Sequence, residues 1–251
     1  MAKQKGFLKL IGTYGDVTFV QTADGFIAKQ KTSVTKSRLM TDPSFIRTRE
    51  NMAEFGTAGK AAKLLRNSML ATIKAASDPR ASSRLTGYMS KVVKADPTGA
   101  RGQRKVVQAN LDMLKGFNFN GQNMLNEVFN TPITATIDRP GGKLAIDIAS
   151  FVPSAVVTPA QGATHIRIIS AGAEVDFDGE TYVSQATVSD PIPLNAVPTA
   201  NIHLENQVTA ASTKGLFLLA GIQFCQEVNG VAYPLSNLSF NALSIVEVSV
   251  S

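Results

Sequence analysis

The sequence of 251 residues has no tryptophan and a single cysteine, Cys225. One cysteine can neither form a disulfide within the chain nor supply a cysteine-based metal cluster, so stability must come from packing or from assembly. The chain has two histidines, His165 and His203. Each lies in an alternating β pattern without a second ligand nearby, so we expect ordinary strand positions and no metal site.

Long apolar runs are also missing. No stretch approaches the roughly 20 apolar residues of a membrane-spanning helix, so no membrane span is expected. The N-terminal residues carry positive charge, but Lys9 interrupts their apolar run, which leaves no recognisable signal peptide. We expect synthesis in the cytoplasm, with an extracellular or virion location after assembly as the alternative.

Catalytic motifs are absent as well. The chain has no Gly-x-Ser-x-Gly elbow, no Gly-Lys-Ser/Thr phosphate loop and no His-Glu-x-x-His. The glycine-rich segment 56–60 lies inside a helical pattern, whereas a phosphate loop lies between a strand and a helix. We therefore predict that the protein is not an enzyme and that it uses no cofactor, metal or small-molecule substrate.

Charge is distributed unevenly along the chain. Residues 1–115 contain 21 Lys and Arg against 8 Asp and Glu, whereas residues 116–251 contain 4 against 11. The two net charges, +13 and −7, together give the formal +6 of the whole chain. Such segregation favours an arm that holds a polyanion, or subunits that attract one another head to tail.

Residues 1–115 are predicted to form a basic module that begins with a β-hairpin or meander. Short apolar runs alternate with turn residues, and Asp24-Gly25 between two such runs is a typical hairpin signal. The expected strands cover 7–11, 17–20 and 26–28. Because so few strands bury little surface, this meander should lie on a larger body or on a neighbouring subunit.

Three helices are expected next, since Asp-Pro pairs occur at 42–43, 78–79 and 96–97. Asp can accept bonds from the free N–H groups of a first helical turn, and Pro fits that turn. The predicted helices cover 43–76 and 79–94, with a third that ends at Gly116. Gly56 and Gly59 in the first helix indicate either a break or close approach by another backbone.

The period of the apolar residues changes to two after Gly116, which predicts antiparallel strands. The segment 216–220 is apolar on both faces and should be a central strand. Candidate strands cover 133–137, 144–148, 155–158, 165–170, 174–177, 181–188, 201–208, 216–226, 231–234 and 243–250. We predict an α+β fold in which residues 116–251 form an acidic, immunoglobulin-like antiparallel β-sandwich.

An acidic run at 174–180 allows three interpretations. Its carboxylates, Glu174, Asp176, Asp178 and Glu180, alternate as in a calcium loop, but the full twelve-residue spacing is lacking. The Asp-Gly pair at 178–179 is more simply a hairpin turn. The same residues could form a docking surface for a basic partner.

Basic residues are dense in the first fifty positions, where they could contact several phosphates. They are diluted by acidic residues, and no nucleic-acid-binding motif accompanies them. A solvated basic face and a contact with the acidic half of another copy are the other two interpretations. The residues concerned are Lys3, Lys5, Lys9, Lys29, Lys31, Lys36, Arg38, Arg47 and Arg49.

Three segments carry a resemblance to known proteins. These are Ile-Gly-Thr-Tyr-Gly-Asp-Val-Thr-Phe at 11–19, Asp-Pro-Ser-Phe-Ile-Arg-Thr-Arg-Glu-Asn-Met-Ala-Glu-Phe at 42–55, and Gly-Lys-Ala-Ala-Lys-Leu-Leu-Arg at 59–66. Over residues 1–115 the chain resembles a group of uncharacterised Bacteroidetes proteins with an N-terminal hairpin, helices and a β-rich C-terminal half. The resemblance implies that layout and brings no catalytic residues.

The leading functional prediction is a structural, self-assembling subunit of a filament, tube or virion-like particle. The basic N-terminal module would contact the acidic β-sandwich of the next copy, so that the partner is the protein itself. The alternative is a nucleic-acid-associated binding protein that uses the basic N-terminal half.

Overall fold

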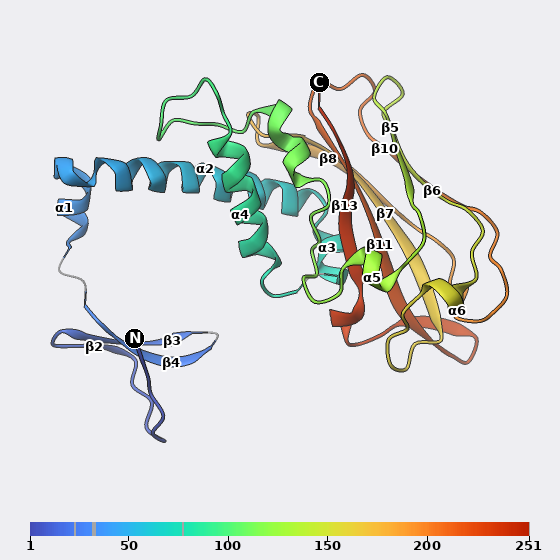
Figure 1. Ribbon diagram of the computed structural model, residues 1–251, viewed down its shortest axis with the longest axis horizontal. Coiled ribbons are helices and arrows are strands. Elements are labelled where there is room, and N and C mark those ends of the chain that lie inside the picture. The colour runs from blue at the N-terminus through green and yellow to red at the C-terminus, as the bar shows by residue number, and fades with distance from the viewer. Residues whose placement is uncertain (23, 32–33, 77, 251) are drawn as a thin grey trace. The chain divides into compact units, whose positions relative to one another are not determined.

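The structure, a computed structural model, describes residues 1–22, 24–31, 34–76 and 78–250 (Figure 1). These residues form two compact units, Met1–Glu50 and Asn51–Ser251. The division falls within helix α2 (Ile46–Ser68). The boundary expected between residues 115 and 116 lies inside the second unit, where helices and sheets share a core.

The first unit contains an antiparallel sheet with the strand order β1-β4-β3-β2. Its strands are β1 (Ala2–Lys3), β2 (Gly12–Tyr14), β3 (Val17–Thr22) and β4 (Gly25–Gln30). Strands β2 to β4 follow one another as the predicted meander does, and Asp24 lies in the second turn. Ala23, also expected in that turn, lies outside the described residues.

The strand expected over 7–11 is wrong. These residues form a loop, in which the side chain of Gln4 accepts a bond from the Leu10 N–H (2.9 Å) and donates to the Leu10 carbonyl (3.2 Å). A side chain therefore satisfies the backbone groups that a neighbouring strand would otherwise have paired.

Two short helical segments close the first unit, α1 (Lys36–Thr41) and the 3₁₀ turn η1 (Pro43–Phe45). The helix start predicted at Asp42-Pro43 is confirmed. The Asp42 carboxylate accepts from the Ser44 N–H at 2.9 Å, and Pro43 occupies the first position of the turn. Helix α1 was not expected.

The helix predicted over 43–76 is divided into η1, α2 and α3 (Leu70–Ala76). The break lies at Met69 and not at the glycines. Helix α2 is continuous through Gly56 and Gly59, and no described atom lies within 4 Å of a Cβ added at either position. The interpretation of these glycines as a break or a close backbone contact is therefore wrong.

Helix α4 (Ala81–Lys94) agrees with the second predicted helix, whereas the third prediction is wrong. Asp96 does not start an α-helix. Its carboxylate accepts from the backbone N–H groups of Thr98 and Gly99, at 2.9 and 3.0 Å, and from that of Lys105 at 3.1 Å. These bonds hold residues 96–105 as a loop, and a 3₁₀ segment, η2 (Gln108–Leu114), follows.

Two antiparallel sheets make up the rest of the second unit. The smaller has the order β10-β6-β5, from β5 (Thr134–Asp138), β6 (Lys143–Ile148) and β10 (Ile202–Gln207). The larger contains β7 (His165–Asp176), β8 (Thr181–Val188), β9 (Ile192–Pro193), β11 (Gly215–Val228), β12 (Val231–Pro234) and β13 (Ala242–Ser249).

Short helical pieces connect the strands: α5 (Leu125–Val128), α6 (Pro153–Val156) and η3 (Leu238–Phe240). The strand predicted over 155–158 is wrong. Pro153 begins helix α6 there, and only Val157 makes an isolated β-bridge, to Phe129. Proline suits a first helical turn, which explains the difference.

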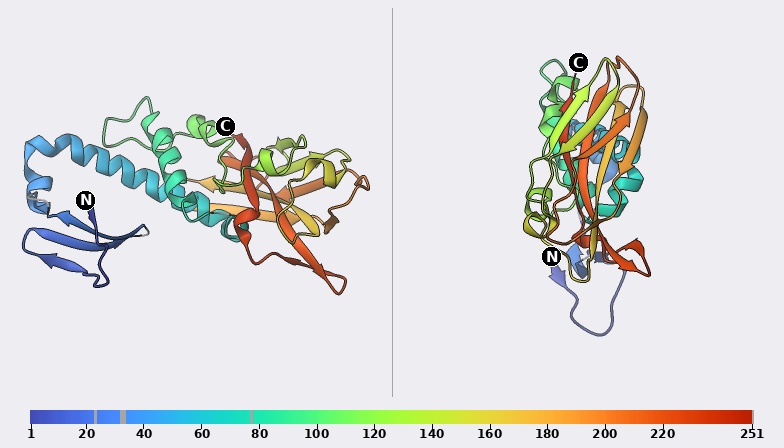
Figure 2. Two further views of the ribbon diagram at one scale, coloured as in Figure 1. Left: turned by 60° about the horizontal axis from the view of Figure 1, so that its bottom comes forward. Right: turned by 90° about the vertical axis from the view of Figure 1, so that its right-hand side faces the viewer.

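The central strands of the larger sheet, β7 and β11, are buried on both faces (Figure 2), whereas β8 and β12 are mostly exposed. One face packs on the helices, where Leu65 and Leu85 meet Phe217 in one cluster of buried residues. The other face packs on the smaller sheet, where Leu218 joins Ile146. Strand β11 lies between β7 on one side and β12 and β13 on the other, so the central strand predicted at 216–220 is confirmed.

The fold is thus α+β with antiparallel sheets. The finer expectation of an immunoglobulin-like sandwich stays a prediction.

Candidate assembly surfaces

The first unit lacks a core of its own. None of the described residues of Met1–Glu50 is buried. Large apolar side chains in it face solvent, and the exposed fractions of Phe7, Ile11 and Tyr14 are 102, 71 and 86 %. A small sheet without a covered face has little to stabilise it, so this unit has the properties of a segment that is completed by a partner surface.

The strand register separates the side chains of this sheet into two chemically different faces. Paired residues share a face, and successive residues alternate between faces. Val17 pairs with Tyr14 and with Gln30, and Thr18 pairs with Lys29. The neutral face consists of Ala2, Gly12, Tyr14, Val17, Phe19, Gln21, Phe26, Ala28 and Gln30. The lysine face consists of Lys3, Thr13, Thr18, Val20, Thr22, Gly25, Ile27 and Lys29.

The predicted basic residues fall into two groups. All six lysines of the set are exposed, and five of them form the first group: Lys3, Lys5, Lys29, Lys31 and Lys36. The others have partners within the unit. Arg38 pairs with Asp42 at 3.2 Å and Arg47 with Glu50 at 3.0 Å.

Arg49 donates to the carbonyls of Leu39 and Asp42, at 3.0 and 2.9 Å, and so holds the turn between α1 and η1. Lys9 donates to the Gln4 carbonyl and lies 6.0 Å from the centre of the Phe26 ring. The sequence pattern could not separate these engaged cations from the exposed lysines, because their partners depend on local backbone geometry.

Asp42 has a pKa lowered from 3.8 to about 2. The Ser44 hydroxyl is the main cause, followed by the Ser44 N–H and by Arg38, because each favours the charged carboxylate. Asp42 is therefore ionised at neutral pH and serves the local turn.

The acidic run at 174–180 covers the end of β7 and the turn into β8. The Asp176 carboxylate accepts from the Gly179 N–H (2.9 Å) and pairs with Lys214 (2.5 Å). Both interactions lower the pKa of Asp176, the Gly179 bond most strongly. Glu174 accepts from the Thr209 N–H at 3.2 Å. Two of the four predicted acidic residues are thus engaged within the chain.

The hairpin-turn interpretation of this run agrees with the structure. Among the described residues, no group of three or more His, Cys, Asp or Glu side chains is placed to hold a metal ion.

The remaining two acidic residues, Asp178 and Glu180, are exposed and line a groove of about 630 Å³. Lysines of the same chain also line this groove: Lys60, Lys63 and Lys105. Leu64, Val106 and Phe177 form the apolar part of the groove. The lysines that share this groove with Asp178 and Glu180 were not anticipated, because they come more than seventy positions earlier in the sequence.

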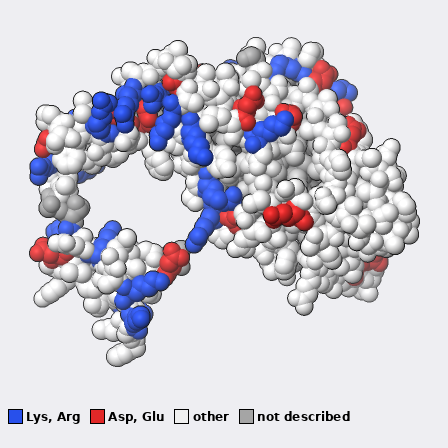
Figure 3. All heavy atoms as spheres, in the orientation of Figure 1, with Lys and Arg blue, Asp and Glu red and all other residues white. Residues whose placement is uncertain are grey.

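Lys and Arg side chains continue along helices α2 and α3 (Figure 3). A second, smaller hollow of about 360 Å³ lies beside them, with Arg66, Lys74 and Ser82 at its edge and Ile73 and Phe119 among its apolar lining. Arg66 donates to the Ser82 hydroxyl at 2.5 Å. This surface was not singled out by the sequence.

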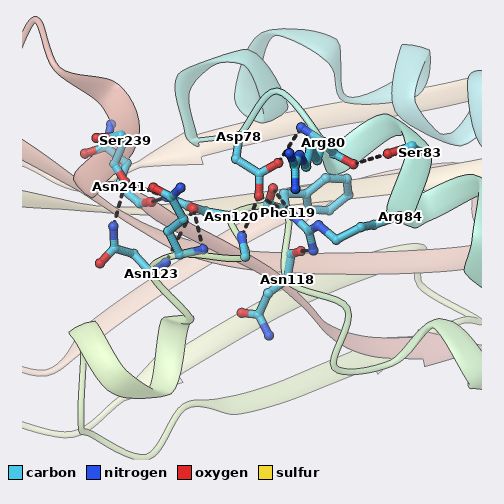
Figure 4. A network of polar contacts seen from close by, with 12 residues as sticks. Asp78, Arg80, Ser83, Arg84, Asn118, Phe119, Asn120, Asn123, Ser239 and Asn241 are labelled. Carbon is cyan, nitrogen blue, oxygen red and sulfur yellow. Dashed lines mark hydrogen bonds and ion pairs between the residues drawn. The ribbon is translucent and has the colours of Figure 1, made fainter. Parts of the chain in front are cut away.

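Buried amides tie the helices to the sheets (Figure 4). Asn120 donates to the carbonyls of Ser239 and Asn241, at 2.6 and 2.8 Å. Asn241 in turn donates to the Ala75 carbonyl at 2.7 Å and accepts from the Phe224 N–H at 2.9 Å. These polar atoms are used to hold segments together, which is a structural role.

The histidines and the cysteine occupy strand positions, as expected. His203 pairs with Asp147 across β10 and β6, with 2.7 Å between Nδ1 and Oδ1, and His165 lies 3.1 Å from Glu227. Cys225 is buried in β11, and burial raises the pKa of its thiol.

No helix in the described part of the chain is both long and apolar enough to cross a membrane. No family model, curated protein or solved structure matches this chain.

Proposed function

We propose that this protein is a structural, self-assembling subunit of a filament, tube or virion-like particle, and that its N-terminal unit is stabilised by packing on a neighbouring copy. The observation that carries the proposal is the absence of any buried residue among the described residues of Met1–Glu50. A chain gains little by ordering such a sheet unless a partner covers it.

Charge supports the choice of a second copy as partner. The lysine face presents Lys3 and Lys29, with Lys5 and Lys31 near the strand ends, whereas residues 116–251 carry a net charge of −7. A contact between the lysine face of one copy and the β-rich half of the next would pair opposite charges. Such a head-to-tail contact repeats indefinitely unless it closes into a ring.

The acidic side of that contact is the exposed tip of the β7–β8 turn, at Asp178 and Glu180. Glu174 and Asp176 support the turn from within, through Thr209 and Lys214. Lys60, Lys63 and Lys105 of the same chain compete with the neighbour's lysines for Asp178 and Glu180. Each contact between two copies should therefore be weak, and the assembly should be held together by many such contacts.

The proposal includes an immunoglobulin-like relationship between the two antiparallel sheets. The shared core between them supports it. The helices that cover the outer face of the larger sheet are an addition to such a sandwich.

Light scattering and negative-stain electron microscopy of the full chain across a salt series test the proposal. We expect ordered polymers or shells at low salt that dissolve as salt screens the contact. The double variant Lys3→Glu/Lys29→Glu should lose them, whereas the control Lys91→Glu/Lys94→Glu, on the exposed last turn of α4, should retain them. A monomer at every salt concentration would contradict the proposal.

A second candidate is binding of nucleic acid, favoured by the cations along α2 and α3, Lys60, Lys63, Arg66 and Lys74. Fluorescence anisotropy with single-stranded and duplex DNA distinguishes it. Affinity that falls steeply with salt, in a chain that stays monomeric, would support this candidate against assembly. For this candidate, the variant Lys60→Gln/Lys63→Gln should bind every DNA sequence more weakly than the unchanged protein does.

A further inference from the structure

We propose that the smaller hollow, which lies beside helix α3, binds an amphipathic organic anion: a carboxylate or phosphate group on a short aliphatic or aromatic body. This inference goes beyond the proposed function, because it concerns a small ligand and not a neighbouring subunit. The hollow belongs wholly to the second unit, so the inference does not depend on the N-terminal sheet.

Packed elements of the second unit form this hollow. Its lining comes from the last turn of α2, from α3, from α4 and from Phe119. Its volume of about 360 Å³ lies within the range of roughly 300–1,000 Å³ that is typical of small-molecule sites. The hollow therefore has the size for a small ligand, in a part of the fold whose elements share one core.

The floor of the hollow is apolar and continuous with the core. Ile73, Leu85 and Phe119 line it, and their exposed fractions are 2, 1 and 1 %. Leu70 adds a more exposed apolar side chain to the same lining. A hydrocarbon body placed against these side chains would leave water, and the loss of hydrated apolar surface on both partners favours binding.

The rim of the hollow is cationic. Arg66 is half-buried and Lys74 is exposed, and neither forms an ion pair within the described part of the chain. The Arg66 guanidinium donates to the Ser82 hydroxyl at 2.5 Å, which holds it in place and leaves its other N–H groups for a ligand. Among the described residues that line the hollow none is Asp or Glu, whereas Asp178 and Glu180 line the larger groove.

The floor and the rim together select the class of ligand. A neutral apolar molecule would make no use of the Arg66 charge, and an anion without an apolar body would make no use of the floor. The guanidinium fork matches the geometry of both carboxylate and phosphate groups, so either head group fits. An anion that carries a short apolar body uses both parts of the hollow at once.

Calorimetric titration of the full chain with octanoate and with octyl phosphate, each kept monomeric, tests the inference. We expect binding at a single site, and the tighter ligand identifies the preferred head group. Acetate keeps the charge and lacks the body, whereas octyl glucoside keeps the body and lacks the charge. Each of these two should bind at least about tenfold more weakly than octanoate.

Variants of the rim locate the binding. Arg66→Gln and Lys74→Gln should each weaken octanoate binding about tenfold, because each removes a charge-assisted hydrogen bond. The control Lys94→Gln removes an exposed cation of α4 that does not line the hollow, and it should bind as the unchanged protein does. Circular dichroism checks that each variant is folded. Lys74 is exposed, so its variant keeps the test decisive if Arg66→Gln does not fold.

Three results would overturn the inference: no binding of either octyl anion, acetate binding as tight as that of octanoate, or equal octanoate affinity in the unchanged protein and both rim variants. If DNA binds with a steep salt dependence and octanoate does not, Arg66 and Lys74 serve the nucleic-acid candidate and this inference fails. Salt-dependent polymers are expected whether or not octanoate binds, so failure here leaves the assembly proposal standing.

Discussion

The guanidinium of Arg84, in helix α4, lies 2.6 Å from the carboxylate of Asp78, in the turn that precedes this helix (Figure 4). Arg84 also donates to the carbonyls of Asn118 and Phe119, at 2.7 and 2.9 Å, and Asp78 accepts from the Gly121 N–H at 2.7 Å. Helices and sheets are therefore connected by hydrogen bonds as well as by their common core.

Replacement of Arg84 by methionine should lower the free energy of unfolding by about 2 kcal/mol, because the Asn118 and Phe119 carbonyls lose their donor and the Asp78 carboxylate loses its partner. Chemical denaturation followed by circular dichroism measures the change. The control Lys94→Met removes an exposed cation from the same helix and should change the value by less than about 0.5 kcal/mol. Equal effects of the two variants would contradict this role of Arg84.

Asn120→Asp should destabilise the fold by about 3 kcal/mol. The change replaces a buried amide donor by an oxygen that faces the carbonyls of Ser239 and Asn241. Asn126→Asp, in the exposed part of α5, is the matched control and should be nearly neutral. Thermal unfolding of both variants gives the comparison, and an unchanged midpoint for Asn120→Asp would refute the proposed role of the amide.

Two glycine-to-alanine changes should act in opposite directions. At Gly221 in β11, an added Cβ would lie 2.6 Å from the Ala242 carbonyl oxygen, so Gly221→Ala should cost about 1–3 kcal/mol. At Gly87 in α4 no described atom lies within 4 Å of the added Cβ, and Gly87→Ala should stabilise by about 1 kcal/mol. The urea concentration at the midpoint of unfolding, measured for each variant and compared with the unchanged protein, checks this directly. Shifts of the same sign in both variants would be inconsistent with the close pairing of β11 with β13.

The stability of the second unit should fall in acid, with a contribution from Asp96. The N–H groups of Lys105, Thr98 and Gly99 hold the pKa of Asp96 well below its ordinary value of 3.8. A carboxylate with a lowered folded-state pKa stabilises the fold above the unfolded value, and that stabilisation is lost as pH falls through the folded value. Asp96→Asn should therefore be less stable at neutral pH and should show a shallower loss below pH 3.8. Parallel stability curves for the two proteins would contradict this assignment.

Local patterns predicted most strands well. The strands expected at 181–188 and 231–234 have the bounds of β8 and β12, because turn residues mark both ends. The helix expected after Asp96 failed for a different reason. Asp96-Pro97 has the same composition as Asp42-Pro43, but its carboxylate also bonds Lys105, a contact that no short window reveals.

The candidate surfaces were predicted only in part. Segregation of charge indicated the exposed lysines of the first unit. The charge pattern could not reveal that Asp178 and Glu180 line the same groove as Lys60 and Lys105. These residues come together because the helices pack on the larger sheet. The division of the first sheet into neutral and lysine faces required the strand register, which the sequence leaves open.

Amide hydrogen exchange of the full chain at several protein concentrations tests the central claim most directly. If neighbouring copies complete the N-terminal unit, the amides of β2 to β4 should exchange quickly in dilute protein and slowly in concentrated protein, whereas those of β11 should be protected at every concentration. Exchange in β2 to β4 that does not depend on protein concentration would contradict assembly through the first unit.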